Sequence, residues 1–318
     1  MGRSSTIEQI YEIVAIDDEG RACRDIPDSA CREEPRNFLT HVGALSLSKS
    51  ADGLIDPKLV LSWLMTALGA PAYLLGLLVP VREAGALLPQ LFTAGAIRRL
   101  PRRKFVWSAG AFLQGLSAMA IGLAALFLEG APAGWVIVGF LALLAVARSA
   151  CSVSYKDVLG KTVSKSRRGK ATGLAGSLSA AAIIIFGLML TFEIGERFSL
   201  VVGALFVAGG FWISGAALFA GLQEHAGATE GGKAAFGAAL ENLSLLREDR
   251  QLQLFILVRG LLTGTALAPP FMLAAAAGRI LTRWAICCWR RLWPPLSALM
   301  SVGGWLIAPA ARCCSLQE

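Results

Sequence analysis

Three long blocks of this sequence contain no charged residue, and they constrain the fold more than any other feature. The blocks run from Phe105 to Phe127, from Pro132 to Ala147 and from Ser199 to Leu222. Each approaches or exceeds the length of about 18–20 apolar residues that crosses a bilayer as a helix. The chain is also 55% hydrophobic and only 16% charged, whereas soluble domains carry about 25% charged residues. These features exclude a soluble globular protein and a single-anchor protein, and they predict an all-α membrane protein with several spans.

The basic excess of the chain is distributed between these apolar segments. The formal net charge is +8, but the Lys and Arg residues flank hydrophobic spans, so nucleic-acid binding is a poor explanation. Residues 1–36 are polar and lack the apolar core of a signal peptide, which predicts a cytoplasmic tail. The seven Cys and two His are not spaced like a metal site, a disulfide framework or a catalytic triad. We therefore expect no cofactor, no metal and no enzymatic activity, and a monomer whose partners are the bilayer and a small-molecule or ion substrate.

The first hairpin can be placed in two ways. A hydropathy window takes Leu59–Val81 as the first span and puts Arg82 and Glu83 in a loop. The next apolar run, Ala84–Ile97, would then extend only about 21 Å at about 1.5 Å per residue. That length is short of the hydrocarbon core of about 30 Å.

The alternative turns the chain at Leu68-Gly69-Ala70-Pro71, a sequence typical of a turn. It predicts one helix over 37–66 and a second over 72–97, and both are long enough to span. We favour this placement, which has a chemical consequence. It puts five charged residues inside the first two spans: Lys49, Asp52, Asp56, Arg82 and Glu83.

The remaining apolar segments predict five further spans. They are residues 104–128, 133–154, 171–192, 199–222 and 252–277. The connections after the second and fourth spans are rich in Lys and Arg, whereas those between them are not. The positive-inside rule therefore places the amino terminus and the even-numbered loops in the cytoplasm.

The predicted organisation has five parts. They are a cytoplasmic polar tail over 1–36, a six-helix transmembrane bundle over 37–222, a cytoplasmic linker over 223–250, the start of a second bundle over 251–278 and an aberrant tail over 279–318. The tail contains five Arg but no Lys, four of the eight Trp and four of the seven Cys. This abrupt change in composition resembles the translation of GC-rich DNA in a shifted reading frame. The alternative is a genuine eighth hydrophobic segment over Leu292–Ala310.

Two loops match motifs of a known family of membrane proteins. The segment after the second span reads Gly95-Ala96-Ile97-Arg98-Arg99-Leu100-Pro101-Arg102-Arg103-Lys104, and the connection before the fifth span contains Arg168-Gly169 followed by Gly173. With six spans and a linker, these motifs make residues 37–277 resemble a bacterial major facilitator superfamily transporter. Arg99 stands where the family has an Asp, so the carboxylate of the family's ion-pair gate is missing from this loop.

The resemblance implies a secondary active transporter of the inner membrane that alternates access between two pseudo-symmetric bundles. It also implies that the two loops take part in gating. The gating-loop candidates are Gly95, Arg103, Lys104, Arg168 and Gly169.

Ionisable groups inside the spans are the candidates for solute or proton binding. Each costs about 2.5–3.5 kcal/mol to insert, so such groups usually pair or face a polar cavity. Lys49, Asp52 and Asp56 follow i, i+3, i+7 spacing, which predicts one helical face. The candidates for substrate contact or proton coupling are Asp52, Asp56, Arg82, Glu83 and Arg148, and Asp52, Glu83 and Arg148 are favoured. The alternative is that the pairs Lys49–Asp52 and Arg82–Glu83 only neutralise neighbours and secure helix packing.

The leading prediction is thus an MFS-like six-helix bundle plus an incomplete second bundle, acting as a truncated transporter of a small solute. The first alternative is a non-functional truncated or frameshifted transporter fragment. This alternative arises because twelve spans and their loops need about 400 residues or more, at about 20 residues per span. The second alternative is a membrane-embedded enzyme.

Overall fold

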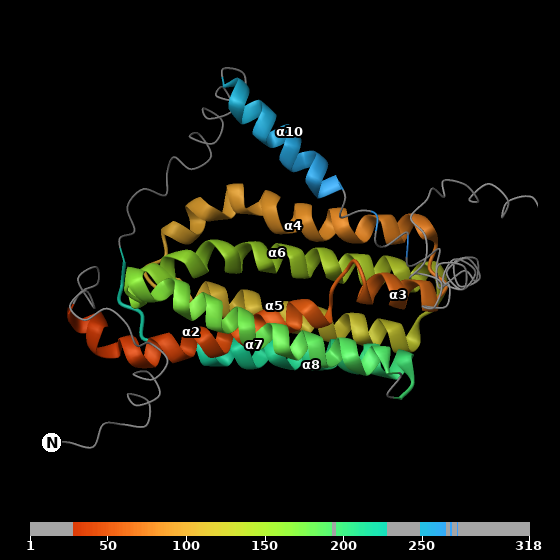
Figure 1. The fold of residues 1–318 in the computed structure, drawn as a ribbon, viewed down its shortest axis with the longest axis horizontal. Coiled ribbons are helices and arrows are strands. Elements are labelled where there is room, and N and C mark those ends of the chain that lie inside the picture. The colour runs from red at the N-terminus through yellow and green to blue at the C-terminus, as the bar shows by residue number, and fades with distance from the viewer. Residues whose placement is uncertain (1–27, 193–194, 228–248, 265–267, 269–271, 273–318) are drawn as a thin grey trace, which may run out of the picture. The chain divides into compact units, whose positions relative to one another are not determined.

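The computed structural model describes residues 28–192, 195–227, 249–264, 268 and 272, and all regular elements in these ranges are helices (Figure 1). The helices are α2 (Asp28–Leu54), α3 (Val60–Ala67), α4 (Ala72–Arg98), α5 (Lys104–Phe127), α6 (Gly130–Thr162), α7 (Lys165–Thr191), α8 (Arg197–Ala220) and α10 (Arg250–Gly264). The tail over 279–318, most of the linker and residues 1–27 of the predicted polar tail lie outside the described residues.

Five of these helices are long and apolar enough to cross a membrane: α4, α5, α6, α7 and α8. The prediction of a multi-span, all-helical membrane protein is therefore supported. The predicted first span is not one of the five. Its helix α2 begins at Asp28, inside the predicted polar tail, and it carries the charged residues Lys49 and Asp52. The six-helix arrangement of the bundle remains a prediction.

The predicted helix over 37–66 is wrong in one respect, because it is interrupted. Helix α2 ends at Leu54 and α3 begins at Val60, and Pro57 lies between them. Proline lacks the backbone N–H of a helical hydrogen bond and clashes with the preceding turn. The Asp56 carboxylate accepts hydrogen bonds from the backbone N–H groups of Lys58 and Leu59, both 2.9 Å long. Asp56 thus stabilises the start of the new helix and is no longer on the helical face of Asp52.

The hairpin turn at Leu68–Pro71 is confirmed. Helix α3 ends at Ala67 and α4 begins at Ala72, and Gly69 has a φ of 72°. This backbone conformation costs Gly little because it has no Cβ. Arg82 and Glu83 therefore lie inside α4, as the favoured placement requires.

Two predicted span boundaries are shifted by basic segments that prove to be helical. Helix α6 continues to Thr162, beyond the expected end at residue 154, and α7 starts at Lys165 instead of residue 171. The charged residues of this connection extend both helices because Lys and Arg are good helix formers. The connection itself is only Val163 and Ser164.

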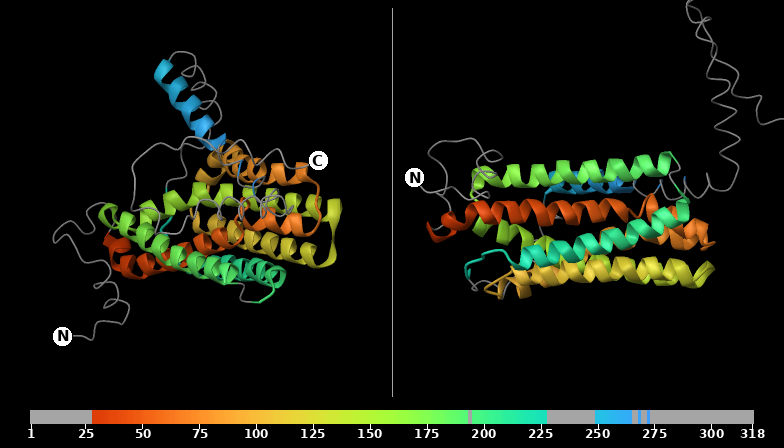
Figure 2. Two further views of the ribbon diagram at one scale, coloured as in Figure 1. Left: turned by 45° about the vertical axis from the view of Figure 1, so that its right-hand side comes forward. Right: turned by 90° about the horizontal axis from the view of Figure 1, so that it is seen from below.

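The helices pack side by side in the order α7, α2, α8, α5, α6, α4, and α2 also contacts α6 (Figure 2). Helices α4 and α7 are the two ends of this series. Only 22% of the apolar window of α4 and 11% of that of α7 are buried, against 44–56% for the other three spans. The sides of α4 and α7 are thus the least covered parts of the bundle.

The packing of α5 against α8 depends on two glycines. A Cβ on Gly115 would lie 2.8 Å from the carbonyl oxygen of Gly209, and a Cβ on Gly209 would lie 3.0 Å from that of Gly115. Such small residues allow close backbone approach in membrane bundles. The α5–α8 contact therefore tolerates little extra volume.

We expect Gly115→Ala to lower the free energy of unfolding by about 1–3 kcal/mol, because overpacking forces the backbones of α5 and α8 apart. Thermal unfolding of the detergent-solubilised chain measures this change. The control is Gly203→Ala on α8, where a Cβ meets nothing within 4 Å. Equal stability of the two variants would contradict this account of the contact.

Candidate functional site

An aspartate on α2 bridges two arginines on two other helices. The Asp52 Oδ1 atom accepts a hydrogen bond from Arg82 Nη2 on α4 at 2.6 Å. Asp52 Oδ2 lies 2.5 Å from Arg148 Nη2 on α6. The side chains of Asp52, Arg82 and Arg148 are 20%, 14% and 28% exposed. We call these three residues the charged cluster; three of the five predicted solute or proton candidates thus meet at one site.

A serine and a tryptophan extend the charged cluster to α8. Arg148 Nη1 donates to the Ser48 hydroxyl at 3.2 Å, and the same oxygen accepts from Trp212 Nε1 at 3.2 Å. Ser48 and Trp212 were not among the predicted site residues. Ser48 precedes Asp52 by one helical turn, so the i, i+4 rule was the signal that could have found it.

Lys49 brings a further positive charge to the same region. It precedes Asp52 by three residues on α2, and its Nζ donates to the carbonyl oxygen of Thr172 on α7 at 3.3 Å. A Cβ on Gly176 would lie 3.5 Å from this Nζ. The charged cluster and Lys49 therefore connect α2 to both ends of the helix series, α4 and α7.

The other two candidates do not join the charged cluster. Asp56 lies beyond the end of α2 and binds backbone N–H groups there. Glu83 follows Arg82 directly on α4, and its side chain is exposed. Adjacent helical residues point about 100° apart, which separates Glu83 from the direction in which Arg82 meets Asp52.

The charged cluster is positive overall and incompletely satisfied. Two guanidinium groups share one carboxylate, and Arg82 Nη1 is buried without a hydrogen-bond partner. A buried donor without a partner costs about 1–3 kcal/mol, and more when it is charged. The arginine N–H groups can therefore donate hydrogen bonds to oxygen atoms of a solute or of water.

A second polar network closes one end of the bundle around Glu224. The Glu224 carboxylate accepts hydrogen bonds from the backbone N–H groups of Arg103 at 3.1 Å and Lys104 at 2.8 Å. Lys161 Nζ on α6 lies 3.4 Å from the same carboxylate. The Glu224 side chain is fully buried. A carboxylate from the segment after α8 thus binds the start of α5.

The basic residues of the predicted gating loops have distinct partners in this region. Arg103 forms an ion pair with Asp157 on α6, and Lys161 pairs with Asp157 at 2.6 Å. Lys104 Nζ donates to the carbonyl oxygens of Ala220 and Leu222 at 2.9 and 2.7 Å. These contacts join α5, α6 and the end of α8.

The remaining gating-loop candidates lie outside the Glu224 network. Arg168 donates to the carbonyl oxygens of Val163 at 2.9 Å and Gly160 at 2.8 Å, so it caps the carboxyl end of α6. Gly169 is exposed, with open space where a Cβ would lie, and Gly95 is buried on α4. The structure therefore brings Arg103 and Lys104 into one network and leaves Arg168 beside it on the α6–α7 connection.

The start of α2 meets the same end of the bundle. The buried Glu34 carboxylate accepts hydrogen bonds from the backbone N–H of Ser164 at 2.9 Å and from its hydroxyl at 2.6 Å. Asn37 exchanges two hydrogen bonds of 3.0 Å with the backbone of Gln223. All the strongly basic connections of the described bundle therefore gather at one end, together with the amino-terminal part of α2.

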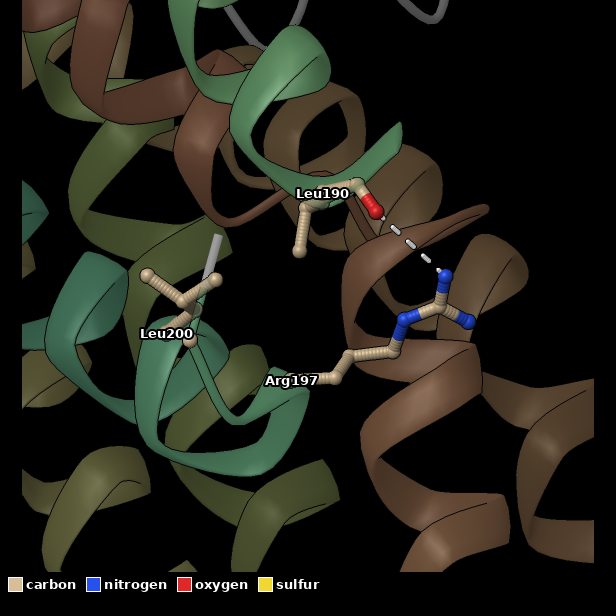
Figure 3. A pocket seen from close by; sticks show the side chains of 4 residues that line it. Leu190, Arg197 and Leu200 are labelled. Atoms are coloured by element: carbon tan, nitrogen blue, oxygen red, sulfur yellow. Dashed lines mark hydrogen bonds between the residues drawn. The ribbon is translucent and has the colours of Figure 1, made fainter. Parts of the chain in front are cut away.

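A separate pocket lies at the α7–α8 connection. It has a volume of about 260 Å³ and is lined by Leu190, Gly195, Arg197 and Leu200. Figure 3 shows Arg197 reaching the carbonyl oxygen of Leu190, a contact of 3.4 Å. None of its lining residues belongs to the charged cluster, so we assign the pocket no part in solute binding.

Metal chemistry has no support in the part of the chain that the structure describes, where no group of three His, Cys, Asp or Glu side chains could hold an ion. The charged cluster, with one carboxylate and two guanidinium groups, is chemically a site for ionic or hydrogen-bonding solutes. No protein-family model matches the sequence, and neither a curated protein nor a solved structure matches it.

Proposed function

We propose that the chain is a secondary active transporter of the major facilitator type, which moves a small solute by alternating access. The observation that carries this proposal is the charged cluster itself. Asp52, Arg82 and Arg148 meet inside a bundle of apolar helices, and ionisable groups within spans are rare and often mark a solute or proton pathway. The resemblance of the loops around Gly95 and Arg168 to the family's motifs supports the same function.

The order of the helices supports a solute pathway between α4 and α7. These two helices end the series, they are the least covered, and the charged cluster and Lys49 connect α2 to both of them. In a transporter of this type a second bundle faces that side. The polar groups then line the space between two bundles.

The gathering of basic residues at one end supports an orientation in the membrane. Arg103, Lys104, Lys161 and Arg168 all lie at the end where α2 starts. Under the positive-inside rule that end faces the cytoplasm, which places the amino terminus there. The proposed location is the inner membrane of a bacterial cell.

The geometry suggests how binding is coupled to movement. Asp52 holds α2 to α4 and to α6 through one oxygen each. A proton or solute that competes for Asp52 would release Arg82 and Arg148, and this change would weaken the links between three helices. Occupancy of the site is thereby linked to the position of α4 against α2.

Reconstitution of the full chain in proteoliposomes tests the proposal. We expect solute accumulation that depends on an imposed proton or sodium gradient, and a loss of at least about tenfold in Arg148→Gln. This factor corresponds to about 1.4 kcal/mol, the scale of one charge-assisted hydrogen bond.

The matched control is Lys156→Gln, which removes one positive charge from an exposed position of the same helix. It should transport like the parent. Gradient-independent leakage, or no flux across a panel of anionic, cationic and neutral solutes, would contradict the proposed function.

A further inference from the structure

We infer that the charged cluster binds a small solute through an oxyanion group, a carboxylate or a phosphate. The inference rests on the proposed function and adds the class of its substrate. It concerns the same residues, Asp52, Arg82 and Arg148, and their neighbours Lys49 and Ser48. Binding of a cationic or uncharged solute instead of an anion would contradict this inference.

The helices that meet at the site carry more positive than negative charge there. Lys49, Arg82 and Arg148 contribute three positive charges, whereas Asp52 contributes one negative charge. Glu83, next to Arg82 on α4, adds a second negative charge, so these five residues keep a net charge of one positive. Positive charge without a partner is unfavourable in a membrane interior. An anionic solute would restore the balance.

The site also holds a hydrogen-bond donor that has no partner. Both oxygens of Asp52 are occupied, one by each arginine. Arg82 Nη1 remains buried without a partner, and a guanidinium group has five N–H donors in a planar fork. That fork matches the oxygens of carboxylate and phosphate groups. The unpartnered Arg82 donor thus needs an acceptor, which an ammonium group cannot provide.

Part of the site is accessible. Arg148 is 28% exposed and Asp52 is 20% exposed, although both lie within helices packed on several sides. The exposed parts of these two side chains are where a small solute would reach the site.

Binding to the purified full-length chain in detergent tests the inference. The probes are succinate, inorganic phosphate, tetramethylammonium and glycerol, titrated at constant ionic strength by calorimetry. We expect binding of succinate or phosphate only, and the stronger of the two identifies the source of the oxyanion. Affinity should fall at least about tenfold in Arg148→Gln and stay unchanged in Lys156→Gln.

Two further variants separate ligand binding from a structural role. Arg148→Lys keeps the charge but loses the fork, so it should recover part of the affinity. Asp52→Asn removes the competing carboxylate, so any folded protein should bind the anion more tightly than the parent. A purely structural role predicts weaker binding in both.

The outcomes also separate this inference from the proposed function. Gradient-driven flux of tetramethylammonium or glycerol alone would keep the transporter and overturn the anion site. Anion binding that depends on Arg148, without flux in proteoliposomes, would support the anion site and overturn the transporter. Equal anion affinity in the parent and Arg148→Gln would overturn the inference directly.

Discussion

Replacing Asp52 by Asn is expected to lower the free energy of unfolding by about 3 kcal/mol. The carboxylate is the shared partner of Arg82 and Arg148, at 2.6 and 2.5 Å. Removing one partner of a buried ion pair leaves uncompensated charge, and here two guanidinium groups lose their partner at once. Thermal or denaturant unfolding of the solubilised chain measures the effect.

A matched substitution and a compensating triple variant sharpen this test. Glu83→Gln removes an exposed carboxylate one position from Arg82 and should change stability by less than about 0.5 kcal/mol. Combining Asp52→Leu with Arg82→Met and Arg148→Met should recover most of the lost stability, because apolar residues replace buried ion pairs at little cost. The triple variant should be inactive in transport, because it lacks the charged groups proposed to bind the solute. Full stability of Asp52→Asn alone would mean that the charged cluster does not hold α2, α4 and α6 together.

Glu224→Gln is expected to open the basic end of the bundle. The fully buried carboxylate binds the backbone N–H groups of Arg103 and Lys104 and the Nζ of Lys161. A charge-assisted hydrogen bond contributes about 1.5–3 kcal/mol. In Glu224→Gln an NH₂ group replaces one carboxylate oxygen, so it faces an N–H donor to which it cannot hydrogen-bond. We expect faster amide hydrogen exchange at the start of α5 and a loss of about 2 kcal/mol in stability.

The control for this prediction is Glu129→Gln at the start of α6. Glu129 is exposed, and its side chain makes no capping hydrogen bond there. Exchange and stability should stay as in the parent. Unchanged amide hydrogen exchange at residues 103–107 in Glu224→Gln would show that the Glu224 network does not stabilise the contact between α5 and the segment after α8.

The residues of the charged cluster, but not their pairing, were predictable because the chemistry of the membrane interior is restrictive. The pairs expected from the sequence were Lys49 with Asp52 and Arg82 with Glu83, whereas Asp52 binds Arg82 and Arg148. Once the turn was placed at Leu68–Pro71, Asp52 and Arg82 both fell inside spans, and charges in spans need partners. Arg148 followed for the same reason. The turn itself was readable because Gly69 and Pro71 are turn residues with defined backbone preferences.

Other parts of the site depend on information that residue spacing does not contain. Asp56 has the spacing of a helical face, but the adjacent Pro57 ends that helix and makes Asp56 a ligand of backbone N–H groups. Glu224 lies more than a hundred residues from its partner Lys104. Its role follows from how the ends of α5 and α8 meet, which no local pattern encodes.

The most direct test of the central claim, that the charged cluster faces water within the membrane, is cysteine accessibility. In a variant whose own cysteines are replaced, Ser152→Cys lies one turn from Arg148 on α6, and Val146→Cys lies at an exposed apolar position of the same helix. A charged thiol reagent needs a thiolate and therefore water. In proteoliposomes we expect Ser152→Cys to react at least about tenfold faster than Val146→Cys, a difference of about 1.4 kcal/mol in activation free energy. Equally slow reaction at both positions would contradict it.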